Sequence, residues 1–379
     1  MKIRDKILII GGYGTVGSLV SIQLARRYPS KIIIAGRNRA KAEALIGEHR
    51  LYAHAIYMDI VGGGFQEVNF EELHTVINCL ETDNITFLLE CVNLDINYVE
   101  VGASYETHKR FFEIADYINH SNSLVVPSVG LIPGLSNVLA YNGATLFDSV
   151  EEIHSYVMLG LGESHGVDSI RWMLNKMNSP FEIKTGAGNV RVKGFTHPKS
   201  TLLLNENKKR TFYLFDFSDH HIIPLFIETK AIDTRIAFDS RTVTKLFHLF
   251  RKIGVMNWYN RIDPKSFKKV LDLMGVGSDR YTLQVEIGGI DKKQNPLKIA
   301  YSVSGHNEAL ATASVTAFVS EVLYTNKTLN GLRHIEEICD LDELRSYLER
   351  QNITITNKTI YENNSIQSSR KSRTHRVVG

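Results

Sequence analysis

Short apolar runs alternate with helical patterns along the first 130 residues. The run at 6–10 (KILII) is typical of a buried strand, and residues 16–28 place Val16, Leu19 and Leu24 near one face of a helix. Further strand-like runs occur at 31–36, 54–60, 74–80, 96–102 and 123–130, with helical stretches at 39–48, 84–94 and 106–118. This alternation predicts βαβ units and a mostly parallel sheet covered on both faces.

The pattern changes after about residue 150, where strand candidates rich in Tyr, Phe, Val and Thr dominate. They are IHSYVML, FEIKT, NVRVKGF, TFYLFDF, TKAIDTRIAF, RYTLQVEIGG and KIAYSVSG. Helices are predicted at about 166–178, 242–253 and 265–274. Partial period-two alternation in the strands predicts an antiparallel or mixed α+β domain, distinct from the first.

The C-terminal part returns to a helical pattern and then becomes polar. A helix is predicted after Asn307, opening with small residues that permit close packing, and a second over LDELRSYLERQ. Residues 356–379 carry many Asn, Ser, Lys and Arg and few apolar residues. This composition predicts a disordered tail, whose basic residues are either solvated or in contact with a polyanion.

Composition and charge narrow the class of protein. The chain has 379 residues, which suggests two or three domains, and its net charge of +3 is too small to indicate nucleic acid or a membrane surface as the main partner. Three widely spaced cysteines suggest neither a disulfide framework nor a zinc site. No apolar run is long enough for a signal peptide or a membrane span, so we expect a soluble, cytoplasmic protein.

The strongest chemical signal lies between the first strand and the first helix. It is the motif Gly12-Tyr13-Gly14-Thr15-Val16-Gly17, a GxGxxG. Gly12 suits a tight turn, Gly14 allows a pyrophosphate to approach the backbone, and Gly17 allows close packing of helix and strand. The helix N-terminus then offers free N–H groups to the phosphates, so the motif predicts a dinucleotide site. The alternative is a glycine-rich turn that binds nothing.

The choice of dinucleotide depends on the end of the second strand. An acidic residue there usually holds the ribose 2′-OH of NAD, whereas this strand ends in Arg37 and Asn38, followed by Arg39 and Lys41. A guanidinium at Arg37 would pair with a 2′-phosphate, so NADP is favoured and NAD stays possible. The alternative is that Arg37 is only a solvated residue ahead of the next helix.

Two further strand ends are candidates for contact with the cofactor. Asp59 ends the third strand, where it would either accept a hydrogen bond from the adenine amine or cap a turn. Cys79 follows the fourth strand, where backbone contact beside the cofactor is expected. Cys79 is better explained as a small core residue than as a nucleophile, because no base is marked nearby.

These residues also carry a family resemblance. The segments IIGGYGTVG, IIIAGRN, VINCL, VGASYETHKRFFEIA and VGLIPGLSNVLA together resemble the saccharopine dehydrogenase-like family, which includes saccharopine reductases and carboxynorspermidine dehydrogenase. The similarity covers residues 5–145 and resumes in GHNEALATASVTAFVSEVL. Relatives carry an Asp in a GLDPG sequence where Ile132 stands here, which leaves the substrate open.

The resemblance implies an architecture and an activity. It implies a Rossmann-type doubly wound parallel sheet (1–130 plus 306–350) with an inserted α+β domain (131–305) for substrate and dimerisation. Members of the family are often homodimers, and they reduce an imine formed between an amino acid and an oxo compound. We therefore expect an NAD(P)-dependent oxidoreductase that acts on a small amino-acid-derived metabolite.

Candidate catalytic residues follow partly from the same resemblance. It implies that Ser104 and Tyr105 contact the substrate, with the tyrosine hydroxyl orienting an imine or relaying a proton; the alternative for Ser104 is a helix cap. Arg171 would clamp a substrate carboxylate, or else be a surface helix residue. Pro133 and Gly134 set the entry into the next helix, as part of the site or only as a hinge.

Other assignments remain open from sequence alone. His220 and His221 are predicted to lie on a strand and to point apart, which makes a metal site unlikely there. An enoyl or keto reductase acting on an apolar substrate would have the same Rossmann motif. So would a non-catalytic NADP-binding regulator that retained the fold.

Overall fold

The structure of the protein, a computed structural model, describes residues 4–82, 84–162, 167–177, 179–254, 277–326 and 328–361. The helix predicted at 265–274 lies outside these ranges, as does the chain beyond 361. Within the described ranges, no helix is long and apolar enough to span a bilayer. The elements form two sheets, one of seven strands and one of nine.

The first sheet is parallel throughout and contains the glycine motif. Its strands run in the order β15-β6-β5-β4-β1-β2-β3. Their bounds are β1 Lys6–Ile10, β2 Ile32–Gly36, β3 Ala53–Tyr57, β4 Leu73–Asn78, β5 Asn97–Glu100, β6 Leu124–Val126 and β15 Gly331–Leu332. The strand order reverses on either side of β1, which places a ligand-binding crevice at the carboxyl ends of β1 and β4.

Helices cover both faces of this sheet, which explains why β1 is apolar throughout. Ile7 and Ile9 are buried in one hydrophobic cluster, and Leu8 and Ile10 in another on the opposite face. The first face is covered by α1 (Thr15–Arg27), α2 (Arg39–His49) and α11 (Glu308–Thr325), and the second by α3 (Thr86–Asn93), α4 (Tyr105–Glu113) and α5 (Ala115–Asn119). The predicted doubly wound α/β fold is confirmed.

The second sheet is mixed, and seven of its strands correspond to the seven predicted runs. Its main path is β10-β11-β12-β7-β13-β14-β16, with β8 paired to β12 and β9. β12 and β7 are parallel, while β13 is antiparallel to both of its neighbours. The bounds are β7 Phe147–Leu159, β8 Pro180–Thr185, β9 Gly188–Lys193, β10 Lys199–Thr201, β11 Arg210–Leu214, β12 Thr229–Phe238, β13 Arg280–Asp291, β14 Pro296–His306 and β16 Thr354–Tyr361.

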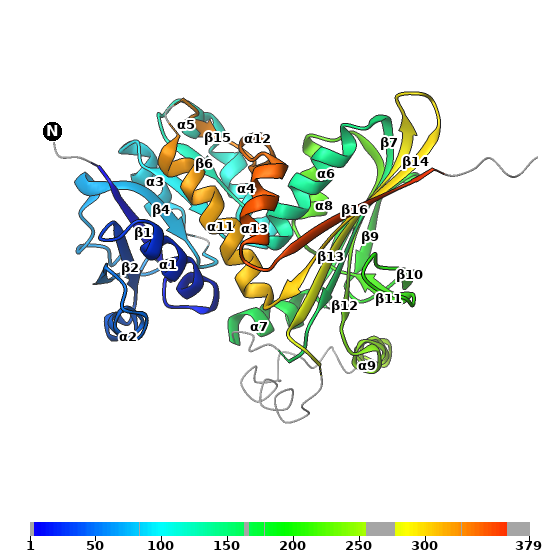
Figure 1. Ribbon diagram of the computed structural model, residues 1–379, viewed down its shortest axis with the longest axis horizontal. Coiled ribbons are helices and arrows are strands. Elements are labelled where there is room, and N and C mark those ends of the chain that lie inside the picture. The colour runs from blue at the N-terminus through cyan, green and yellow to red at the C-terminus, as the bar shows by residue number, and fades with distance from the viewer. Residues whose placement is uncertain are drawn as a thin grey trace, which may run out of the picture.

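The two sheets stand side by side with helices between them (Figure 1). α11 packs on α1 and on the first sheet, and α6 (Ser136–Ala144) packs on β7 and β13 of the second. The small residues of α11 permit this packing, since Ala311, Ala313 and Ser314 are fully buried. The remaining helices are α7 Val167–Lys176, α8 Asp219–Ile222, α9 Arg241–Lys252, α12 Ile335–Ile338 and α13 Leu341–Glu349, with short turns η1 Phe70–Glu72, η2 Leu131–Leu135 and η3 Ile223–Leu225.

The prediction of a disordered tail over 356–379 is wrong for residues 356–361. Residues 356–361 belong to β16, which pairs antiparallel with β14, for example Thr356 with Ser302. The strand is polar because it lies at the edge of the sheet and its side chains are largely exposed, so it lacks the apolar pattern of a core strand. The backbone hydrogen bonds to β14 order this segment where its composition suggested disorder.

Candidate functional site

The glycine motif forms a tight turn that has no room for side chains at its base. A Cβ atom at Gly17 would overlap the backbone of Gly11, and one at Gly12 would lie 2.9 Å from the carbonyl oxygen of Ile9. At Gly14 the nearest neighbour of a Cβ would be the Gly11 carbonyl oxygen at 3.2 Å. The turn therefore packs tightly against β1 and α1 at Gly12 and Gly17 and is more open at Gly14.

The first turn of α1 is suited to an anion. The helix begins at Thr15 with Gly14 as its N-cap, no side chain caps it, and no acidic residue lies in its first turn. The N–H groups of Thr15, Val16 and Gly17 belong to that first turn, where backbone donors have no partner within the helix. They point a partial positive charge toward the carboxyl edge of the sheet.

Tyr13 connects the glycine turn to the end of β2. Its hydroxyl accepts a hydrogen bond from the backbone N–H of Asn38 at 2.8 Å, and its ring lies against Gly36, where a Cβ would be 2.5 Å from the ring. The Asn38 side chain caps α2 by accepting from the backbone N–H of Lys41 at 3.1 Å. Tyr13 and Asn38 thus fix the backbone on either side of Arg37.

The Arg37 side chain is exposed and has no ion-pair partner among the described residues, whereas Arg39 has two. Arg39 pairs with Glu43 at 2.9 Å and with Glu67 at 3.8 Å. Among the residues that the structure describes, no carboxylate lies within ion-pair distance of the Arg37 guanidinium. An exposed guanidinium at the end of β2 can bind a phosphate without first giving up a partner.

Asp59 and Cys79 both lie at the carboxyl edge. The Asp59 carboxylate accepts hydrogen bonds from the backbone N–H groups of Val61 and Gly62, both at 3.2 Å, so it caps a turn as the alternative expected. The backbone N–H of Cys79 donates to Ile10 at 3.0 Å, and burial raises the pKa of the Cys79 thiol to about 12. A thiol that stays protonated is a poor nucleophile.

Glu100, at the end of β5, was missed by the sequence reasoning. It is 3% exposed, one carboxyl oxygen accepts a hydrogen bond from the Asn78 side chain at 2.9 Å, and Oε1 has no partner among the described residues. Burial raises the pKa of Glu100 to about 8, so the carboxyl is mostly protonated at neutral pH. The only sequence signal was an acidic residue that ends an apolar strand.

Ser104 and Tyr105 lie between this edge and the second domain. Ser104 occupies the N-cap position of α4, but its side chain makes no capping hydrogen bond. Tyr105 is half-buried, and its ring stacks on His221 of the second domain, with centroids 4.4 Å apart and planes at 21°. Within the described part of the chain, neither hydroxyl has a hydrogen-bond partner, so both are available to a ligand.

His220 and His221 lie on helix α8, and the prediction that they occupy a strand is wrong. A strand would point them apart, whereas the helix brings their rings to 4.2 Å between centroids. Sequence alone could not distinguish the two because α8 has only four residues, too few to show a period. His221 Nε2 lies 3.0 Å from Asp216 Oδ1, and Lys176 Nζ lies 2.5 Å from Asp216 Oδ2.

The electrostatics of this group follow from burial and pairing. Burial alone would raise the pKa of Asp216, but the hydrogen bond from His221 and the charge of Lys176 lower it to about 2. Burial lowers the pKa of His220 to about 3, so this ring is neutral, and neither of its nitrogens has a hydrogen-bond partner among the described residues. The group comprises one carboxylate, one ammonium and a half-buried imidazole in contact with Tyr105.

The other predicted catalytic elements lie in different surroundings. Arg171 is exposed on α7, and the cation of α7 that reaches the Asp216 group is Lys176. Pro133 and Gly134 precede α6 as expected, and Ser136 and Asn137, in its first turn, are buried. The turn at 131–135 packs against α11 of the first domain as well as against α8, so it forms part of the contact between the two domains.

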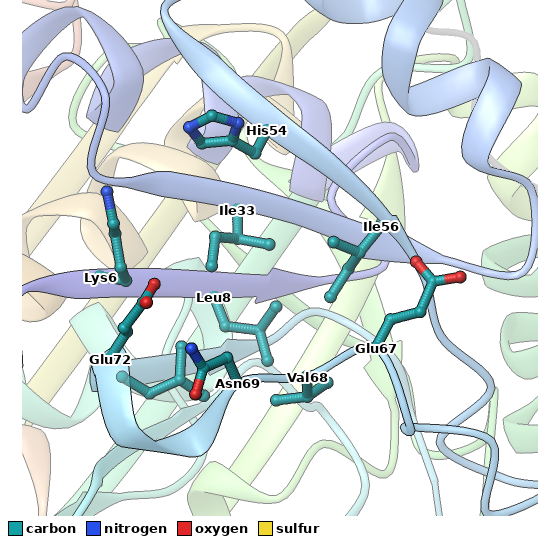
Figure 2. Close-up of a pocket in the computed structure, with 10 residues that line it drawn as sticks. Lys6, Leu8, Ile33, His54, Ile56, Glu67, Val68, Asn69 and Glu72 are labelled. Carbon is teal, nitrogen blue, oxygen red and sulfur yellow. The ribbon is translucent and has the colours of Figure 1, made fainter.

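Two surface clefts lie away from this site. Figure 2 shows one of about 290 Å³, lined by residues of β1, β2 and β3 and of the segment 67–73. A second, of about 750 Å³, lies between the end of α6, the start of β7 and the β8–β9 hairpin. Neither cleft is lined by a residue of the glycine turn or by Arg37, Tyr105 or Arg171. The candidate site is therefore defined by the positions of side chains at the carboxyl edge of the first sheet.

Comparison with known proteins identifies the fold. No protein-family model matches the sequence, and no curated protein gives a significant match. The structure is similar to apo saccharopine dehydrogenase (L-Glu forming) from Saccharomyces cerevisiae, with a TM-score of 0.67 and 14% identity over 94% of this chain and 100% of that chain. A meso-dapdh mutant with DAP from Clostridium tetani gives a TM-score of 0.46 and 15% identity over 90% and 99% of the two chains.

The match to the yeast structure confirms the expected resemblance at the level of fold. The chain shares the fold of the yeast saccharopine dehydrogenase structure over 94% of its own length. At 14% identity the similarity concerns the fold.

Proposed function

We propose that this protein is an NADP(H)-dependent oxidoreductase that transfers hydride to an imine or carbonyl of a small amino-acid-derived metabolite. The observation that carries the proposal is that a GxGxxG turn at 12–17 occurs together with Arg37 at the end of the neighbouring strand, where this arginine has no ion-pair partner among the described residues. The two features supply what NADP requires at once: an anion site for the diphosphate and a cation for the 2′-phosphate.

The described residues fit this cofactor. The lack of space for a Cβ at Gly17 keeps α1 close to β1, and the uncapped first turn of α1 leaves amides for the diphosphate. Arg37 would hold the 2′-phosphate, Asn38 and Tyr13 would hold the backbone beside the ribose, and Asp59 and Cys79 would lie along the adenine and nicotinamide ends. When bound, the cofactor supplies or accepts a hydride, and the protein orients the substrate and excludes water.

An amino-acid-derived substrate is supported by the fold and by the available hydroxyls. The similar yeast structure is a saccharopine dehydrogenase (L-Glu forming), an enzyme named for an amino-acid product. Ser104 and Tyr105 place two hydroxyls, which have no hydrogen-bond partner among the described residues, beside the carboxyl edge of β5, where they would orient a polar substrate. Arg171 is proposed as a second contact, to a substrate carboxylate, and the exposure of its side chain is compatible with that role.

The first experiment separates binding from turnover. We would titrate NADPH and NADH by calorimetry, and then follow NADPH oxidation at 340 nm (the nicotinamide absorbance) with mixtures of 2-oxo acids and amino acids, and with ketones and enoyl compounds as controls. We expect tighter binding of NADPH and turnover with at least one imine-forming pair. Absence of affinity for either nucleotide would refute the proposal, and binding without any turnover would favour a non-catalytic regulator.

We also propose that the protein is a homodimer, which the family resemblance implies through the inserted domain. Light scattering coupled to size-exclusion chromatography would test this. A monomer at micromolar concentration would contradict it.

A further inference from the structure

We propose that His221, held by Asp216, is the proton donor of this reaction. The inference rests on the proposed oxidoreductase function and adds to it the group that completes the proton balance. It is carried by the contact of His221 with Tyr105, which joins an imidazole of the second domain to the carboxyl edge of the first sheet.

The geometry assigns a role to each ring nitrogen of His221. Nε2 lies 3.0 Å from Asp216 Oδ1, and Asp216 is a carboxylate that can only accept hydrogen bonds. Nε2 must therefore carry a proton in both the neutral and the charged form of the ring. Nδ1, which has no partner among the described residues, is left to give or take the second proton.

The surroundings hold this arrangement in place. Lys176 donates to the other oxygen of Asp216, so each oxygen of the carboxylate has one donor. His221 is 18% exposed in its side chain, so a substrate at the edge can reach the ring. Charged or titratable groups that face or act on it from the packed elements are Tyr105, Lys176, Asp216, Asp219 and His220.

The proposed step balances in atoms and electrons. The imine carbon accepts hydride from the reduced nicotinamide, and the π pair of the C=N bond moves to nitrogen. That nitrogen takes the proton from Nδ1 of His221, so an N–H bond forms as the Nδ1–H bond breaks. The products are a secondary amine, the oxidised nicotinamide and a neutral imidazole, which solvent then reprotonates. With a carbonyl substrate, oxygen takes the same proton.

A divalent cation is the competing explanation of the same residues. Asp216, His220 and His221 each offer one atom, and these atoms lie within 4.8 Å of one another. The ammonium of Lys176, 2.5 Å from Asp216, opposes a second cation there and already occupies one carboxylate oxygen. The existing hydrogen bonds therefore favour proton transfer.

The test uses variants that preserve packing. His221→Phe keeps a ring to stack on Tyr105 but removes both nitrogens, and Asp216→Asn keeps the shape of the orienting group. His306→Phe is the matched control, because His306 is likewise a histidine paired with a carboxylate, that of Asp279 at 2.7 Å, and is exposed. With an imine-forming pair that the wild type reduces, we expect kcat to fall about 100-fold or more in His221→Phe and to stay unchanged in His306→Phe.

Two readouts do not depend on turnover. In ¹⁵N NMR of the histidine-labelled protein, the His221 signals, assigned by their loss in His221→Phe, should show the Nε2–H tautomer, and Asp216→Asn should shift them toward a mixture of tautomers. Calorimetric titration with zinc alone should show no stoichiometric binding at this group.

The outcomes separate this inference from the function on which it rests. A wild type that binds no nucleotide or reduces no substrate would refute the oxidoreductase itself. An active wild type with an equally active His221→Phe variant would overturn only the proton donor. So would an Nδ1–H tautomer, or stoichiometric zinc binding that Asp216→Asn abolishes.

Discussion

Replacing Arg37 by Asp should change the choice of nucleotide. The side chain lies at the end of β2, is exposed, and has no ion-pair partner among the described residues. Its removal therefore breaks no ion pair with the described residues, and we expect its effect to appear in nucleotide binding. The new carboxylate would also stand where NAD enzymes carry an acid for the ribose 2′-OH.

The magnitude follows from the exposure of the site. A hydrogen bond to a charged group contributes about 1.5–3 kcal/mol, and solvent screening at an exposed guanidinium favours the lower end. Repulsion between the new carboxylate and the 2′-phosphate adds about 1 kcal/mol at 4 Å in water. Together these terms predict that Arg37→Asp weakens NADPH binding by roughly 100-fold, since 1.4 kcal/mol corresponds to about tenfold.

The assay is calorimetric titration of both nucleotides into wild type, Arg37→Asp and Arg39→Asp. Arg39 is the matched control, because the same charge change two residues away affects a side chain that is already paired with Glu43 and Glu67. NADH affinity should be unchanged or improved in Arg37→Asp, and the loss for NADPH should shrink as salt is raised. Equal losses for NADPH and NADH, or an equal effect of Arg39→Asp, would refute the 2′-phosphate role.

Three other changes probe the site and the fold. Tyr105→Phe keeps the ring against His221 but removes the hydroxyl, so turnover should fall about tenfold at unchanged NADPH affinity, and unaltered turnover would exclude the hydroxyl from the reaction. Glu100→Gln should remove a loss of stability that the wild type shows as pH rises from about 4.5 to about 8, because the folded state keeps the proton of Glu100 that the unfolded chain releases. Urea unfolding at pH 5 and pH 8 measures this difference, and parallel pH dependences in the two proteins would contradict it. Truncation after Ile355 should lower stability by about 2 kcal/mol, because it removes residues 356–361 of β16 and their hydrogen bonds to β14, whereas an unchanged urea midpoint would show that the strand contributes nothing.

Burial of side chains explains most of the strands that the sequence predicted; the exception is β9, whose side chains are largely exposed. The run TKAIDTRIAF matches β12, Thr229–Phe238, because residues buried against two neighbouring strands must be apolar, β-branched or well paired. β16 and β10 escaped notice for the opposite reason. They lie at the two ends of the sheet path, where one side of the backbone has no strand to pair with and polar side chains are tolerated.

Within the candidate site, the division is between local and distant contacts. The dinucleotide turn could be predicted because its determinants are adjacent in the chain: a buried strand, three glycines and a helix with an uncapped start. Arg37 was also predictable, because its place at the end of a strand is local. The ion pair of Arg39 with Glu43 is also local, since the two residues are four apart on one helix. The second contact of Arg39, to Glu67 at 3.8 Å, depends on how the chain folds back beside α2, as does the lack of a carboxylate near Arg37 among the described residues.

The sequence by itself determined the doubly wound sheet and the position of its glycine turn, since both depend on short-range periodicity and on the conformational freedom of glycine. Only the tertiary structure decided that Tyr105 meets His221, that Asp216 and Lys176 stand behind that ring, and that His220 and His221 share a helix. The physical reason is that a polar side chain gains its chemical character from burial and from its partners. Tyr105 reaches His221 from the other domain, and Lys176 reaches Asp216 from a different helix, so neither contact can be deduced from the order of residues in the chain.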